Sequence, residues 1–123
     1  MNMRHQFRNL TVWQNSIRLV TDVYKVTKEF PSDERFGLVT QIQRSAVSIP
    51  SNIAEGTGRG TDKDFSNFLN MALGSSYELE TQLLIGNNLK YLKDDELTKV
   101  LDPLHEIQKM LASLITNLKS KAS

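Results

Sequence analysis

Apolar residues recur at steps of three and four along almost the whole of this 123-residue chain. That spacing places them on one face of an α-helix, whereas a half-buried strand would alternate apolar and polar residues. The pattern forms four stretches separated by three short segments, and no stretch shows strand alternation. Four helices with short connections predict an all-α fold, an antiparallel four-helix bundle in which successive helices run up, down, up and down.

Residues that begin or end helices set the expected boundaries. Phe30 ends the first stretch, because the residue before a proline is driven out of the α-helical region. The glycine-rich run at 56–60 separates the second and third stretches, and Thr11, Ser32 and Thr61 or Asp62 are expected N-caps. We therefore predict one domain over residues 1–123, with an N-terminal arm (1–10) and helices over residues 11–29, 32–56, 62–92 and 95–119.

Two positions inside these helices predict local irregularities. Pro50 interrupts an apolar pattern that resumes at Ile53, so the second helix is expected to be kinked at Pro50 rather than ended there. Gly74 lies in the middle of the third helix, where glycine costs about 1 kcal/mol relative to alanine. Because Ser75 and Ser76 follow it, this run of small residues predicts the close approach of another helix backbone.

The first, third and fourth helices carry more apolar residues than the stripe of about 100° that a small bundle needs. Surplus apolar surface indicates either an interface between protein chains or a well-packed core, and the sequence leaves both interpretations open. The leucine heptad of the last helix, from Leu97 to Leu118, favours plain core over a zipper. The candidate interface residues are Val12, Leu19, Val26, Leu73, Leu84 and Ile85.

Charge is distributed unevenly, although the net charge is only +1. Residues 1–60 carry eight Lys or Arg and five Asp or Glu, while residues 61–123 carry seven and nine. Every arginine lies in the first half, and its planar guanidinium binds two phosphate oxygens at once. The uneven charge indicates either ordinary solvated helix faces or a weak anion-binding surface that an oligomer would repeat.

Residue types that carry chemistry are sparse. The chain has no cysteine, and its two histidines, His5 and His105, lack further ligands at metal-binding spacing. The G-x-G-x-G run at 56–60 matches neither a dinucleotide fingerprint nor a P-loop, so with Arg59 it is either a linker or a modest phosphate-binding loop. The acidic run at 94–96 suits a helix start better than a Mg²⁺ site. We expect no catalytic residue, no metal and no cofactor, hence a protein that is not an enzyme.

The sequence also bears on location. The first residues contain no apolar stretch of the kind found in signal peptides. No apolar run approaches the ~20 residues that a membrane-spanning helix needs. A cytoplasmic protein without a membrane partner is therefore expected.

Several motifs resemble one family. They include F-R-N-L-T-V-W-Q at residues 7–14, E-R-F-G-L at 34–38, Q-I-Q-R-S-A at 41–46, S-I-P-S-N-I-A-E-G at 48–56 and G-S-S-Y-E-L-E-T-Q-L at 74–83. Together they resemble the four-helix-bundle proteins encoded in intervening sequences of bacterial large-subunit ribosomal RNA genes. A related branch is the accessory variability protein of diversity-generating retroelements. The resemblance covers roughly residues 7–118.

This resemblance implies a homopentamer without enzymatic activity, in which the surplus apolar faces become contacts between protomers. It also implies binding to ribosomal RNA or another nucleic acid backbone. The alternative is a protein-interaction scaffold, for example for a reverse transcriptase, that does not itself bind nucleic acid. The candidate nucleic-acid contacts are Arg4, Arg8, Arg18, Arg44, Arg59 and Lys63.

Overall fold

Four α-helices account for most of the computed structural model, which describes residues 6–122. They are α1 (Thr11–Thr27), α2 (Leu38–Thr57), α3 (Asp62–Asn88) and α4 (Asp94–Ala122), with short 3-10 helices at Phe7–Asn9 and Ser32–Glu34. No strand occurs within residues 6–122. The predicted all-α bundle of four helices is therefore confirmed.

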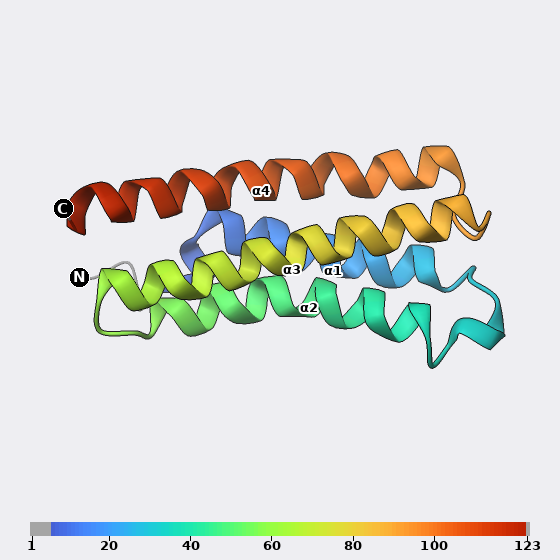
Figure 1. Ribbon diagram of the computed structural model, residues 1–123, viewed down its shortest axis with the longest axis horizontal. Coiled ribbons are helices and arrows are strands. Elements are labelled where there is room, and N and C mark those ends of the chain that lie inside the picture. The colour runs from blue at the N-terminus through green and yellow to red at the C-terminus, as the bar shows by residue number, and fades with distance from the viewer. Residues whose placement is uncertain (1–5, 123) are drawn as a thin grey trace.

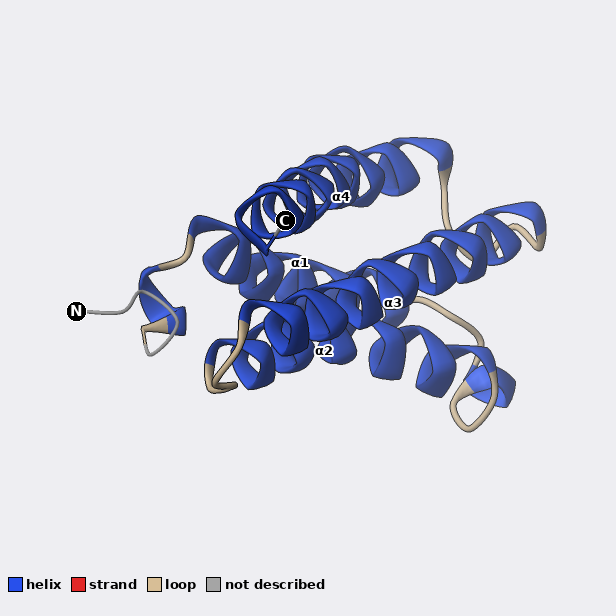
Figure 2. Cartoon of the chain, turned by 60° about the vertical axis from the view of Figure 1, so that its left-hand side comes forward, coloured by secondary structure: helices blue, strands red, loops and turns tan. Residues whose placement is uncertain are grey.

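The helices lie side by side along the long axis of the molecule (Figure 1). The colour gradient runs along α1, returns along α2, and repeats this reversal in α3 and α4, so the chain turns back at each connection. Each helix contacts the helix that follows it, and α1 also contacts α4. Loops are confined to the two ends of the bundle, as the turned view shows (Figure 2).

A single apolar core fills the space between the four helices. All four helices contribute side chains that are fully or almost fully buried. The residues that are completely inaccessible include Val23, Ile42, Ala46, Ile49, Ile53, Leu69, Ala72, Leu79, Leu83, Leu104, Ile107 and Leu111. Because these positions follow the three- and four-residue steps of the sequence pattern, the core is the one that the periodicity predicts.

The start of α2 differs from the prediction. Instead of one helix over residues 32–56, Ser32–Glu34 forms a 3-10 helix and α2 begins at Leu38. The interruption is at Gly37, whose backbone (φ −115°, ψ −107°) is not helical. An apolar period continues across this break, so periodicity alone does not reveal it.

The ends of α1 and α3 also follow local chemistry. Thr61 is the N-cap of α3 as predicted, since its hydroxyl accepts a hydrogen bond of 3.1 Å from the Asp64 amide. By contrast, Leu10 rather than Thr11 occupies the N-cap position of α1. The helix α3 ends at Asn88, four residues before the predicted boundary, because Lys90 adopts a left-handed conformation (φ 68°) that stops the helix.

Small residues join α2 to α3. The hydroxyls of Ser48 and Ser75 lie 2.8 Å apart across the two helices. Gly56 is packed closely. An added Cβ would lie 2.9 Å from the Phe65 ring and 2.9 Å from the Phe68 Cβ. The run at 74–76 thus contacts α2 through the Ser75 side chain, and the predicted approach of a helix backbone stays a prediction.

The two glycines inside α3 differ in their packing. A Cβ added at Gly86 would lie 2.9 Å from the Phe30 ring, whereas Gly74 has open space around it. Pro50 is buried inside a continuous α2, and the kink there stays a prediction.

Candidate nucleic-acid interface

Three of the candidate cations lie at one end of the bundle. At this end α1 begins, α2 ends, α3 begins and α4 ends (Figure 1). Arg8 lies in the 3-10 helix before α1, Arg59 in the α2–α3 connection and Lys63 in the first turn of α3, and all three are exposed. We call this end the basic end, after Arg8, Arg59, Lys63 and Lys119.

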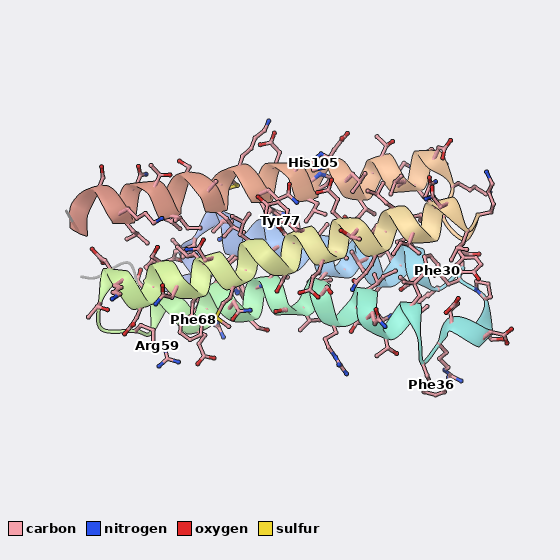
Figure 3. The ribbon with its side chains drawn as sticks, in the orientation of Figure 1. Phe30, Phe36, Arg59, Phe68, Tyr77 and His105 are labelled. Carbon is pink, nitrogen blue, oxygen red and sulfur yellow. The ribbon has the colours of Figure 1, made fainter. Side chains whose placement is uncertain are left out.

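Arg59 is held in a defined position. Its guanidinium lies 4.5 Å from the ring centroid of Phe68, and its Nη2 donates a hydrogen bond of 2.8 Å to Glu55 Oε2. Figure 3 shows Arg59 and Phe68 side by side at the basic end. The contact arises because the chain turns back within the glycine-rich connection and brings the start of α3 beside the end of α2. A guanidinium oriented in this way keeps further N–H donors free to meet an anion.

A second group of polar side chains lies between the start of α3 and the end of α4. Lys63 and Lys119 line a hollow there together with Ser66, Asn67 and Asn70. Lys119 was not among the candidate residues, although a cation in the last turn of a helix is a common pattern. Asp62, which the same hollow includes, reduces its positive charge.

The remaining candidates do not join this group. Arg18 lies in the middle of α1, where its Nη2 donates a hydrogen bond to Asn15 Oδ1. Arg44 is exposed on α2, fifteen residues before Arg59 in the chain. Arg4 lies outside the described residues. The structure therefore separates the six candidates into one group of three, two isolated arginines and one residue that it does not describe.

An apolar groove runs along the outside of the α1–α2 pair. At the end near Phe7 it forms a hollow of about 370 Å³ lined almost entirely by carbon. The next turns of both helices continue into a second hollow of about 500 Å³, lined by Tyr24, Phe30, Lys28 and Arg35 among others. We call this surface the α1–α2 groove and define it by Trp13, Ile17, Val20, Tyr24, Val47, Pro50 and Ala54.

The candidate interface residues occupy different environments. Val12 and Leu19 are 4% and 1% exposed, so the interface prediction is wrong for them: they face inward and belong to the core. Val26 and Leu73 are half-buried against that core. Leu84 and Ile85 are exposed on α3, each at 42%.

Other exposed apolar residues were missed by the sequence analysis. Ile17, Tyr24, Val47, Met71 and Tyr77 are all strongly exposed. A helical wheel of α1, α2 or α3 carries the necessary signal, since these positions lie outside the inward stripe. Periodicity alone does not show where a broad stripe ends.

One polar cluster bridges α3 and α4. Glu80 Oε1 accepts a hydrogen bond of 2.9 Å from Gln108 Nε2, and Glu80 Oε2 lies 3.1 Å from His105 Nε2. These two hydrogen bonds, that of Gln108 first, hold the pKa of Glu80 below its ordinary value. His105 lies on α4 (Figure 3) and, although the sequence analysis rejected it as a metal ligand, it has a structural partner in Glu80.

The family model of the 23S rRNA-intervening sequence protein matches residues 8–113. The chain belongs to this family. The match spans most of the chain and confirms the family that the sequence motifs resemble. No functionally curated protein matches the sequence.

A solved structure resembles this family member over nearly its whole length. It is the crystal structure of a protein with unknown function from the S23 ribosomal protein family of Bacteroides thetaiotaomicron. The two chains are 28% identical, the alignment covers 85% of this chain and 95% of the other, and the TM-score is 0.79. The bundle is therefore shared with that relative.

Two further observations concern the described part of this family member. Among residues 6–122, no three His, Asp or Glu side chains come together in an arrangement able to hold a metal ion. Within the same residues, no helix has the length and apolar character that crossing a membrane requires.

Proposed function

We propose that this protein is a non-enzymatic homo-oligomer, of five copies as the resemblance implies, that binds the phosphate backbone of RNA in the cytoplasm. The observation that carries the proposal is Arg59, whose exposed guanidinium is oriented by Glu55 and Phe68 at the basic end. An oriented guanidinium loses less conformational freedom when it binds a phosphate. The family name, which refers to 23S rRNA, favours RNA among the nucleic acids.

An oligomer would strengthen a weak site. The basic end of one chain carries only a few cations, and the acids Glu55, Asp62 and Asp64 lie among them. Several copies joined in one assembly would present the same cations repeatedly to a single RNA molecule. Once one copy is bound, the other sites act at a high effective concentration, so the overall affinity exceeds that of one site.

The absence of catalysis is part of the proposal. Glu80 lies between His105 and Gln108, but its pKa is lowered by their hydrogen bonds. A general acid at neutral pH needs a carboxyl group whose pKa is raised, usually by an apolar environment. This cluster is therefore better suited to joining α3 to α4 than to transferring protons.

The RNA-binding proposal is tested with two matched double variants. R59Q/K63Q removes two cations from the basic end, and K93Q/K99Q removes two exposed cations from the opposite end. Binding to a 23S rRNA fragment is measured across a salt series. We expect R59Q/K63Q to reduce the slope of log K against log[salt] by about 2 for each copy that contacts the RNA, one for each lost phosphate contact. The K93Q/K99Q variant is expected to keep the wild-type slope.

Two results would contradict the proposal. One is the absence of binding by the wild-type protein at low salt. The other is an equal loss of affinity in both double variants, because binding would then follow net charge rather than the position of the basic end.

The second candidate function is a protein-interaction scaffold, with a reverse transcriptase as one possible class of partner. The exposed apolar side chains of the α1–α2 groove favour it, since such surfaces bind proteins. Affinity purification from the native host, with and without nuclease treatment, distinguishes the two functions. The scaffold function would be supported by two results together. Protein partners remain bound after nuclease treatment, and no RNA is recovered from the untreated sample.

A further inference from the structure

The helix α3 has a second apolar face that points away from the core. Met71 and Tyr77 are 54% and 53% exposed, and Leu84 and Ile85 follow along the same helix. Residues such as Leu69, Ala72, Leu79 and Leu83 already fill its inward side. Glu78 and Thr81 are exposed among the outward residues, but so many large apolar side chains on an outward side indicate a contact with a partner. This second surface, defined by Met71, Gly74, Tyr77, Leu84 and Ile85, is called here the α3 face.

Gly74 lies in the middle of the α3 face and has no role inside the chain. A Cβ atom at this position would meet nothing within 4 Å. Glycine in a helix interior lowers stability relative to alanine, so its presence needs another cause. A glycine allows another backbone to approach closely. Since no segment of the same chain approaches Gly74, the partner that it suits is another molecule.

The α1–α2 groove and the α3 face have comparable lengths and complementary shapes. From Met71 to Ile85 the α3 face extends over 14 residue steps, about 21 Å at the helical rise of 1.5 Å per residue. On α1 the groove runs from Trp13 to Tyr24, 11 steps or about 17 Å. The hollow near Phe7 is apolar and the second hollow is mixed in polarity, whereas the α3 face is convex.

The charges of the two surfaces are complementary. Beyond its first turn, α3 carries no Lys or Arg, and its exposed acid is Glu78, because Glu80 is bonded to His105 and Gln108 of α4. The residues that line the two hollows of the groove include Lys28 and Arg35 and no Asp or Glu. Opposite charges on facing surfaces favour one orientation of two partners and disfavour the pairing of like surfaces.

We propose that the α3 face of one copy docks in the α1–α2 groove of a second copy. The inference rests on the homo-oligomer part of the proposed function and names the two surfaces that form the contact. Because the surfaces differ, the interface is heterologous, and each copy uses its groove for one neighbour and its α3 face for the other. Repetition of such a contact produces a closed ring, or an open filament if the rotation does not close.

Three variants test the assignment. I17D/V47D places carboxylates in the groove, and M71D/I85D places them on the α3 face. The control A112D/T116D places the same number of carboxylates on α4, at two exposed positions outside both surfaces. All six residues are exposed, so the fold should persist, and circular dichroism verifies this.

The expected result is measured as mass by light scattering at micromolar concentration. Wild type and A112D/T116D form the oligomer, whereas the Asp pair on either surface weakens the association roughly a hundredfold or more and yields the 14.0 kDa monomer. A mixture of I17D/V47D and M71D/I85D then recovers a dimer of one chain of each kind and nothing larger. Only one intact groove and one intact α3 face remain to pair in that mixture.

The outcomes separate the two proposals. A monomeric wild type overturns both the homo-oligomer and the assigned surfaces. An oligomeric wild type with I17D/V47D or M71D/I85D still fully assembled overturns only the assigned surfaces. Monomers that fail to pair on mixing also overturn the assignment, because a heterologous contact requires the recovered dimer. Failure to pair on mixing is the result expected if the groove binds a different protein.

Discussion

The two longest helices, α3 and α4, bury similar inner faces but differ on the outside. Among the side chains that the structure describes, α4 has no strongly exposed large apolar residue, whereas α3 has Met71, Tyr77, Leu84 and Ile85. The sequence analysis predicted surplus apolar surface on α4 as well, but its large apolar residues are buried or packed against the core. The number of apolar residues in a helix therefore does not determine which sides of the helix they occupy. An outward apolar face, as on α3, calls for a partner outside the chain.

The largest expected effect tests whether the inner faces are equivalent. Leu69 on α3 and Leu104 on α4 are both completely buried. Replacing either by alanine should lower the free energy of unfolding by about 2–5 kcal/mol, through lost burial and the cavity that remains. Chemical denaturation of L69A and L104A measures this. A loss below about 1 kcal/mol for only one of them would show that the inner faces are not equivalent.

A smaller loss is expected where α3 meets the α1–α2 connection. In G86A the new Cβ would lie 2.9 Å from the Phe30 ring, a distance that forces a shift. Overpacking of this kind should lower the free energy of unfolding by about 1–3 kcal/mol, partly offset by the helix propensity of alanine. Urea denaturation provides the measurement, and an unchanged midpoint would mean that Phe30 moves without cost.

The opposite sign is expected for the same substitution on the α3 face. Since nothing lies within 4 Å of a Cβ at position 74, G74A should stabilise the monomeric fold by about 0.5–1 kcal/mol. Measurement at concentrations below assembly isolates the monomer. Destabilisation would place an unseen neighbour at Gly74 within the chain and remove the contrast with Gly86.

The smallest effect concerns the polar contact between α3 and α4. Because hydrogen bonds lower the pKa of Glu80 in the folded chain, the carboxylate stabilises the fold above its unfolded pKa. That stabilisation is lost as the pH falls through the folded pKa. E80Q should therefore cost at most about 1 kcal/mol at pH 7, since the pair with His105 is partly exposed.

Urea denaturation of wild type and E80Q at pH 7 and at strongly acidic pH measures this dependence. The difference between the two proteins should shrink on acidification. A difference that stays constant would assign it to side-chain packing rather than to the charge of Glu80.

Local signals in the sequence predict much of the bundle. The four apolar periods give the helices and most of the core, and Thr61 marks the start of α3 because capping depends on neighbouring residues. The break at Gly37 is hidden, since the apolar period continues through it. Val12 and Leu19 were misassigned because the width of an apolar stripe does not show which of its residues face inward.

The candidate site depends more on tertiary structure. The distribution of arginine predicts cations of interest, but the stacking of Arg59 on Phe68 requires the turn between α2 and α3. Likewise, Lys63 and Lys119 are 56 residues apart in the chain and meet only because α3 and α4 pack together. The outward direction of Met71 and Tyr77 becomes visible only when the inner face of α3 is known.

The glycine–aromatic contacts at the two ends of α3 have a consequence for chain length. Gly56, at the end of α2, receives Phe65 and Phe68, while Gly86, near the end of α3, receives Phe30 from the segment before α2. The stretch of α3 from Phe68 to Gly86 therefore spans the same length of the bundle as the segment from Phe30 to Gly56, although the second includes the turn before α2. An insertion or deletion in one helix would separate a ring from its glycine unless the other helix changed by the same length. We expect natural length variants to alter α2 and α3 together.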